Sequence, residues 1–294
     1  MSDFLNYFVN GLSGGAIYSL IALGFVIVFK ATEVVNFAHG SLVVLGGYVV
    51  YLTNKSLPFV VAVLCGAAAA GLAALFMERV FVRKLRDGGL NALAILTIGV
   101  DIVVITEMTR RLGDNGVNID DPWGSKLVHL GPITLFQSRV AALLTALVLL
   151  GAFFAVFKFS SWGVAMRAAA EDGEAAALMG IRRGRVTAIA WFVAGALAAV
   201  AAVFLVAQPT PGLDSFVRVQ ALRAFPAAIL GGLDSTAGAV VGGLLIGVTE
   251  SLIAGYGVTI NGGSLGDVGP YLVMLVVLLV RPSGLLGTRE VSRV

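Results

Sequence analysis

The chain has 294 residues, of which 58% are hydrophobic and only 13% are charged, and its mean hydropathy is +0.95. Soluble domains carry about 25% charged residues, so this composition excludes an ordinary water-soluble protein and indicates an integral membrane protein. The net charge of +3 comes from basic residues spread over the predicted loops, so we attribute it to membrane topology and not to nucleic-acid binding.

Apolar segments long enough to cross the hydrocarbon core, which takes about 17–25 residues, recur along the whole chain. Seven are predicted, near 11–29, 58–78, 91–109, 138–158, 186–207, 237–256 and 266–281. Two more, 38–53 and 217–231, are short or interrupted by Gly and Pro226, as in tilted, broken or re-entrant helices, and their full crossing is left open. Glycines four residues apart, such as Gly11 with Gly15 and Gly243 with Gly247, indicate close helix packing.

The predicted fold class is therefore an all-α integral membrane protein. We expect a polytopic helical bundle with about eight or nine membrane segments, one or two of them short or broken. No low-complexity linker divides the chain, so residues 1–294 are expected to form a single transmembrane domain.

The Lys and Arg residues predict the orientation of these segments. If all nine cross in turn, Lys30, the loops 79–90 and 158–185 and the C-terminal tail share one side, which holds most of the 20 basic residues. Cytoplasmic loops are enriched in Lys and Arg, so we expect the N-terminus outside and the C-terminus in the cytoplasm. The first residues lack a basic stretch and a cleavage site, which predicts that the first apolar segment is retained.

The segment 162–185 is too charged to lie in lipid. Ala-rich helix formers run over 164–179, and Gly180 is placed as a C-terminal stop. Arg167 and Glu171 are one turn apart and can pair on the exposed face. A solvated linker helix and a docking helix are both compatible with this pattern. The apolar side chains available for docking are Ala168, Ala175, Leu178 and Met179.

Glu174, Ala175 and Ala176, followed after three residues by Gly180, resemble the EAA-x-x-x-G signature of bacterial importer permeases. The whole chain also resembles, from residue 10 to its end, the permease subunit of branched-chain amino acid ABC transporters. The stretches that carry this resemblance are 14–24, 36–40, 78–80, 167–181, 228–232 and 282–287.

The resemblance implies that 162–185 is a cytoplasmic coupling loop, which seats in an ATP-binding subunit and transmits its motion. The residues expected to couple are Arg167, Glu171, Asp172, Glu174, Ala175 and Gly180. It also implies ATP-binding subunits, a second permease subunit that is homologous or identical, an extracytoplasmic solute-binding protein and a multi-pass location in the bacterial inner membrane.

Nucleotide chemistry is expected to lie outside this chain. None of its lysines follows a glycine, so a phosphate-binding P-loop is absent, and ATP and Mg would be used by the partner subunit. The sequence also lacks HExxH, GxSxG and any Cys cluster, so we expect no enzyme activity, catalytic residue, cofactor or metal site in this chain.

Three polar residues in apolar segments are candidates for the translocation path. Asn36 and His39 open the short second segment, where they either cap free backbone N–H groups or face the path. Glu250 lies within 237–256, where a charge in lipid is costly. Glu107 is expected to pair with Arg110 and Arg111 at the interface. Asp101 has no counterpart in the family pattern, and its role is left open.

The predicted function is the permease subunit of an ABC importer that moves branched-chain amino acids or related small polar solutes by ATP-driven alternating access. An ABC permease for urea, amides or aromatic acids is an alternative, because related permeases look alike. A different class, the autonomous secondary transporter or channel, would need its own ion-coupling residues. The solute, and the choice between a permease homodimer and heterodimer, stay open.

Overall fold

The computed structural model describes residues 2–85, 89–113, 115–131, 133–209, 211–257, 259–260, 263–264, 266 and 268–288. Within them it is almost entirely helical. The helices are α1 (Ser2–Thr32), α2 (His39–Asn54), α3 (Phe59–Met77) continued by the π-helix η1 (Glu78–Val82), α4 (Leu90–Leu112), α5 (Gln137–Phe159), α6 (Ser161–Glu171), α7 (Gly173–Leu178), α8 (Arg183–Leu205), α9 (Val217–Leu222), α10 (Ala224–Gly231), α11 (Thr236–Gly255) and α12 (Gly269–Val280).

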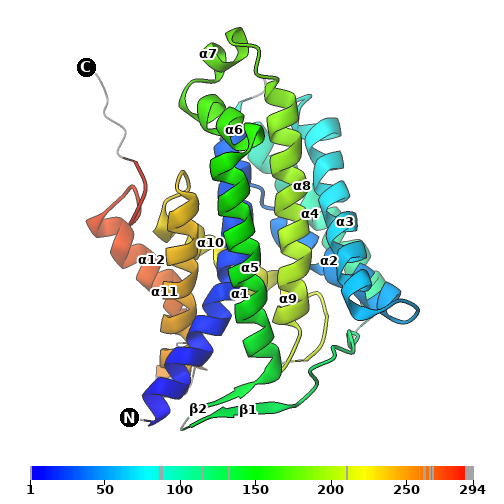
Figure 1. Cartoon of the computed structure of the whole chain (residues 1–294), viewed down its shortest axis with the longest axis vertical. Coiled ribbons are helices and arrows are strands. Elements are labelled where there is room, and N and C mark those ends of the chain that lie inside the picture. Colours follow the sequence, from blue (N-terminus) through cyan, green and yellow to red (C-terminus); the bar gives the residue numbers. More distant parts are fainter. Residues whose placement is uncertain are drawn as a thin grey trace.

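Two small antiparallel hairpins complete the fold. One is β1 (Leu127–Leu130) with β2 (Ile133–Phe136), in which Leu127 lies opposite Phe136, and the other is β3 (Thr259–Ile260) with β4 (Gly263–Ser264). The long helices run roughly parallel to the long axis of the molecule (Figure 1). The N-terminus and the β1–β2 hairpin lie at one end, and α6 and α7 lie at the other (Figure 1).

The polytopic helical bundle expected from the sequence is confirmed. Within the described residues, six helices are long and apolar enough to cross a membrane: α1, α3 with η1, α4, α5, α8 and α11. α2 and the α9–α10 pair are short or broken, as expected. α12 differs from the prediction, because the segment expected to cross over 266–281 forms a helix of only 12 residues.

α1 and α8 form the centre of the bundle. The most apolar stretch of α1 is 83% buried and that of α8 is 67% buried, whereas in α5 only 17% is buried. Lipid is as apolar as a protein core, so the outer helices need no protein cover on their exposed side. α1 packs most extensively against α11, and a Cβ atom at Gly15 would lie only 2.7 Å from the Cα of Leu244. The close packing predicted from Gly11, Gly15, Gly243 and Gly247 is therefore confirmed.

α2 starts inside the bundle. After α1 the chain turns back, and Thr97 of α4 accepts a bond from the N–H of Phe37 and donates one to the carbonyl of Val35, both at 3.3 Å. The ring of His39 then lies 4.6 Å from that of Phe25, two turns before the end of α1. With 16 residues, α2 measures roughly 24 Å, less than the ~30 Å hydrocarbon core.

The segment predicted over 217–231 is a broken helix. α9 ends at Leu222, Arg223 forms the junction, and α10 begins at Ala224. Pro226 lies in the first turn of α10. Backbone N–H groups in a first turn have no partner within the helix, so the missing N–H of proline costs no hydrogen bond there. The break therefore comes before the proline, at Arg223.

The single helix predicted over 164–179 was wrong. Asp172 adopts an extended conformation, and its side chain accepts bonds of 2.9 Å from the N–H groups of Glu174 and Ala175, which ends α6 and caps α7. The predicted stop at Gly180 is confirmed. The φ angle of Gly180 is +85°. The N–H of Gly180 donates to the carbonyl of Ala177, and the N–H of Ile181 donates to the carbonyl of Ala176.

Candidate functional site

The broken helix α9–α10 carries two arginines, and each binds a carboxylate on a different helix. Arg218 in α9 lies 3.3 Å from Asp101 of α4, and Arg223 at the junction lies 2.6 Å from Glu250 of α11. All four side chains lie mainly inside the protein. An unpaired charge at such a position is costly, so each pair accounts for the presence of its acid. Asp101, which the sequence left unexplained, is the partner of Arg218.

Asn36 and His39 are completely buried at the start of α2. The Asn36 carboxamide oxygen accepts a 3.1 Å bond from the N–H of Ala38, just before α2, whereas α2 itself has no side-chain cap. The Asn36 amide nitrogen has no hydrogen-bond partner among the described residues. A Cβ atom at Gly24 would lie 2.6 Å from the His39 ring, so α1 leaves room for the imidazole only because it has a glycine there.

A cavity of about 450 Å³ lies at the N-terminal end of α1, between α1, α5 and α11. Glu250 lines it together with Tyr18 of α1 and Arg139 of α5. Asn36 and His39 are not among its lining residues. The structure therefore brings Glu250 together with Tyr18 and Arg139, and it places the other two path candidates elsewhere.

Aromatic rings connect the Arg223 junction to the start of α2. Phe225 lies 5.4 Å from Phe25 and 5.9 Å from Phe37, and Phe25 in turn contacts His39. An apolar contact formed by Phe25, Phe37 and Phe225 therefore lies between the Arg223–Glu250 pair and the start of α2 with Asn36 and His39.

The charges that line the cavity do not cancel. Glu250 and Arg139 are its two charged lining residues, and Glu250 is already bound by Arg223. Within the part of the chain that the structure describes, no carboxylate lies within 4 Å of Arg139. Gly14 leaves space beside this guanidinium, because a Cβ atom there would lie 3.7 Å from its Nη1. Arg139, Arg223 and Glu250 together carry a net charge of +1, a setting that suits a carboxylate.

The predicted coupling residues lie on α6 and α7 at the opposite end of the molecule (Figure 1). Glu174 and Ala175 are exposed, and the side chains of Leu178 and Met179 are 89% and 84% exposed. Large apolar side chains with so little cover indicate a contact surface.

The pairing of Arg167 with Glu171 that their spacing allows is not formed. Arg167 donates to the carbonyl of Phe157 and lies over its ring, and among the described residues it makes no salt bridge to Glu171. The helix junction at Ser160 brings the end of α5 within reach, so tertiary contact prevails over the one-turn spacing. Arg167 and Glu171 instead line a cavity of about 830 Å³ with Lys30 and Asp234.

Glu107 is explained as expected. It accepts bonds of 2.8 Å from Arg110 and 2.5 Å from Arg111, at the exposed end of α4.

Sequence reasoning missed Arg139, Arg218 and Arg223, although an arginine in an apolar stretch is itself a signal, because charges in membrane segments are rare and mark functional or paired sites.

One solved structure resembles this fold. A chain of PsaBC from Streptococcus pneumoniae, determined in complex with Fab, matches with a TM-score of 0.50 and 14% sequence identity, and the match covers 95% of this chain and 92% of that one. At that identity the likeness concerns the fold alone.

Curated relatives match over nearly the whole chain. The high-affinity branched-chain amino acid transport system permease protein LivH of Salmonella typhimurium is 33% identical, and BraD of Pseudomonas aeruginosa, with the same description, is 32% identical. Each match covers 99% of this chain and 98% of the relative. A probable branched-chain amino acid transport permease protein, LivH of Methanocaldococcus jannaschii, is 29% identical over 94% of this chain and 91% of its own length.

Residues 7–279 match the family described as branched-chain amino acid transport system / permease component. Apart from the first residues of α1, this match takes in the six described helices that are long enough to cross a membrane, together with the coupling segment and the cavity with Arg139 and Glu250. The chain therefore belongs to the permease family of branched-chain amino acid transport systems and is a multi-pass membrane protein.

Proposed function

We propose that this chain is the permease subunit of an ABC importer for branched-chain amino acids, located in the bacterial inner membrane. ATP, with Mg, is hydrolysed by separate ATP-binding subunits that seat on α6 and α7. A second permease subunit and an extracytoplasmic solute-binding protein complete the transporter. The names and full-length similarity of the relatives support the substrate, and the exposed Leu178 and Met179 support the docking.

The placement of the two cavities supports alternating access. Both cavities lie along α1. Five residues between Tyr7 and Tyr18 line the cavity near the N-terminus of α1. Phe29, Lys30 and Glu33, at the other end of the helix, line the cavity near α6. Between them, residues 20–23 and 25–28 of α1 are buried. A solute that followed α1 would meet a closed barrier in this state, so transport requires the helices around α10 to move.

The position of Arg139 in the cavity wall, without a salt bridge to any described residue, favours an amino acid over a neutral solute. A carboxylate gains a charge-assisted bond from this guanidinium, which forms no salt bridge with any described residue, whereas urea and simple amides have no charge to offer it. The Glu250–Arg223 pair and the Tyr18 hydroxyl nearby offer acceptors and a donor for the rest of the solute. We therefore propose that Arg139, Glu250 and Tyr18 contact the solute during transport.

The test is ATP-driven uptake of radiolabelled leucine into proteoliposomes that contain the assembled transporter and its binding protein. A hydrogen bond to a charged group is worth about 1.5–3 kcal/mol, so Arg139→Gln should lower kcat/KM for uptake roughly 10- to 100-fold. The matched control is Arg110→Gln, because Arg110 lies at the exposed end of α4 and binds Glu107. Gel filtration checks that both variants assemble. Uptake by Arg139→Gln equal to that of the control would show that this cavity does not hold the solute.

A further inference from the structure

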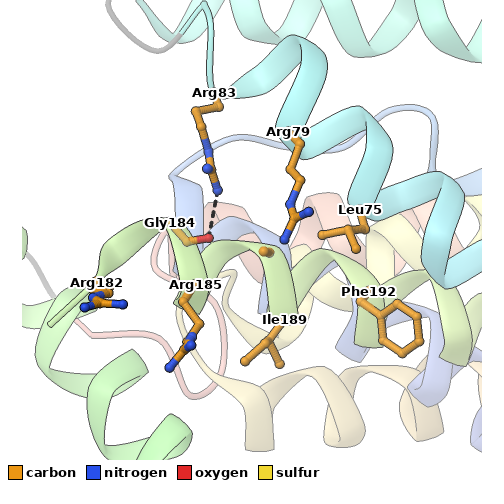
Figure 2. Close-up of a pocket in the computed structure, with 9 residues that line it drawn as sticks. Leu75, Arg79, Arg83, Arg182, Gly184, Arg185, Ile189 and Phe192 are labelled. Carbon is orange, nitrogen blue, oxygen red and sulfur yellow. Dashed lines mark hydrogen bonds between the residues drawn. The ribbon is translucent and has the colours of Figure 1, made fainter.

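A third cavity, of about 540 Å³, lies between the ends of α3 and α8 nearest α7, apart from the two cavities along α1. Arg79 and Arg83 reach from η1 toward the first turn of α8, where Arg83 donates a 2.9 Å bond to the carbonyl of Gly184 (Figure 2). Arg182 and Arg185 come from the start of α8. Four arginines therefore line one cavity at the end of two helices that are long enough to cross a membrane.

Among the described residues, most of this positive charge has no counter-ion. Glu78 lies beside the cluster, and its carboxylate is already bound by Arg83 at 3.2 Å and by the hydroxyl of Thr187 at 2.8 Å. Arg79, Arg182 and Arg185 make no salt bridge with any described residue. A group with several anionic oxygens would satisfy these donors, and a phosphate matches the fork of a guanidinium.

The remaining wall of the cavity is apolar. Leu75 lies one turn before Arg79 on α3, and Ile189 lies one turn after Arg185 on α8, followed by Phe192 (Figure 2). Leu75 and Phe192 lie farther along α3 and α8 than the arginines do (Figure 2). Phe192 is held against α3, because a Cβ atom at Gly71 would lie 2.8 Å from its ring. The cavity is thus basic at the end of the helices and apolar along them.

We propose that this cavity binds an anionic phospholipid, with the phosphate among Arg79, Arg182 and Arg185 and an acyl chain along Leu75 and Phe192. Basic pockets between membrane helices bind such headgroups on the cytoplasmic side. A free phosphate would use only the arginines, so the apolar wall favours the lipid. Arg83 has a structural role here, because it already holds Glu78 and the first turn of α8.

The test measures lipid retention by native mass spectrometry of the assembled transporter, purified in detergent and titrated with phosphatidylglycerol or phosphatidylcholine. Arg79→Gln/Arg185→Gln should raise the apparent Kd for phosphatidylglycerol at least tenfold and leave phosphatidylcholine binding unchanged. The matched control is Arg110→Gln/Arg111→Gln, which removes two arginines from the end of α4. If the double variant does not assemble, the exposed Arg185→Gln alone replaces it, with the same direction expected.

A second variant separates the lipid from a free anion. Leu75→Gln changes only the apolar wall, so it should weaken phosphatidylglycerol binding while the four arginines stay in place. Inorganic phosphate at millimolar concentration should not displace the lipid. Displacement by phosphate, or an unchanged Kd in Leu75→Gln, would identify a free-anion site. Equal retention by the arginine variants and the control would overturn the proposal altogether.

Discussion

Two ion pairs define the chemistry of the bundle interior at the scale of single residues. Asp101 and Glu250 lie in membrane helices, and each is bound by an arginine from the broken helix α9–α10. The reason for such pairs is the cost of a lone charge, since removing one partner leaves the other uncompensated. Arg139 differs from both arginines in having no acid within 4 Å among the described residues, and this difference is the basis for proposing it as a solute-binding residue.

Asp101→Asn is expected to destabilise the protein by leaving Arg218 unpaired. Breaking a buried ion pair costs about 3–5 kcal/mol, so the midpoint of thermal unfolding in detergent should fall by several degrees. Glu107→Gln is the matched control on the same helix, because its carboxylate lies at the exposed rim and should matter little. The exchange Asp101→Arg/Arg218→Asp should recover part of the loss. A midpoint that falls equally in Asp101→Asn and Glu107→Gln would contradict the assignment.

At the scale of elements, hydropathy located the membrane helices, since a long apolar run has few other stable positions. The short and broken segments were also foreseen, from their length and from Pro226. The β1–β2 hairpin was missed, because two strands of four residues outside the membrane leave almost no periodic pattern. The break at Asp172 was missed although an aspartate is a preferred helix cap. The Ala-rich stretches on both sides favoured one continuous helix.

The site was harder to predict than the elements. Glu250 could be proposed from the sequence because a carboxylate in an apolar segment is itself a signal. Arg139 lies at the start of α5, where an arginine also resembles an ordinary interfacial residue. Its role depends on Tyr18 and Glu250, which come from helices far apart in the sequence. Such convergence is tertiary and leaves no local signal.

α7 is expected to bind the ATP-binding subunit through its exposed apolar tip. Burying two such side chains is worth about 1.5–3 kcal/mol each, so Leu178→Ser/Met179→Ser should weaken copurification of the ATP-binding subunits at least tenfold. The membrane helices should be unaffected, because neither side chain packs against them. Leu127→Ser is the control, since Leu127 is 49% exposed at the opposite end of the molecule. Normal copurification and normal uptake by the double variant would remove α7 from the coupling interface.

At the scale of the whole molecule, the fold places the coupling helices and the N-terminus at opposite ends (Figure 1). An odd number of membrane crossings between the N-terminus and α6 would likewise place them on opposite sides of the membrane. The arginines near α7 favour that end as the cytoplasmic one. In that orientation, the cavity with Arg139 lies at the end of the molecule to which the proposed binding protein would deliver solute. Solute entry and ATP hydrolysis would act on opposite ends of α1, so the orientation of the chain underlies the whole proposed mechanism.

This orientation predicts a difference in labelling by a membrane-impermeant thiol reagent. In a Cys65→Ala background, Ser125→Cys should react in intact spheroplasts, whereas Ala177→Cys should react only after the membrane is permeabilised. Both positions are exposed, so access and not burial decides the result. Ser125 lies just before β1 and Ala177 lies in α7, and α5 is the one membrane-crossing helix between them. Denatured samples give the total of reactive thiols for each variant. Labelling of both cysteines in intact spheroplasts would show that α5 does not cross the membrane, and the reverse pattern would invert the topology.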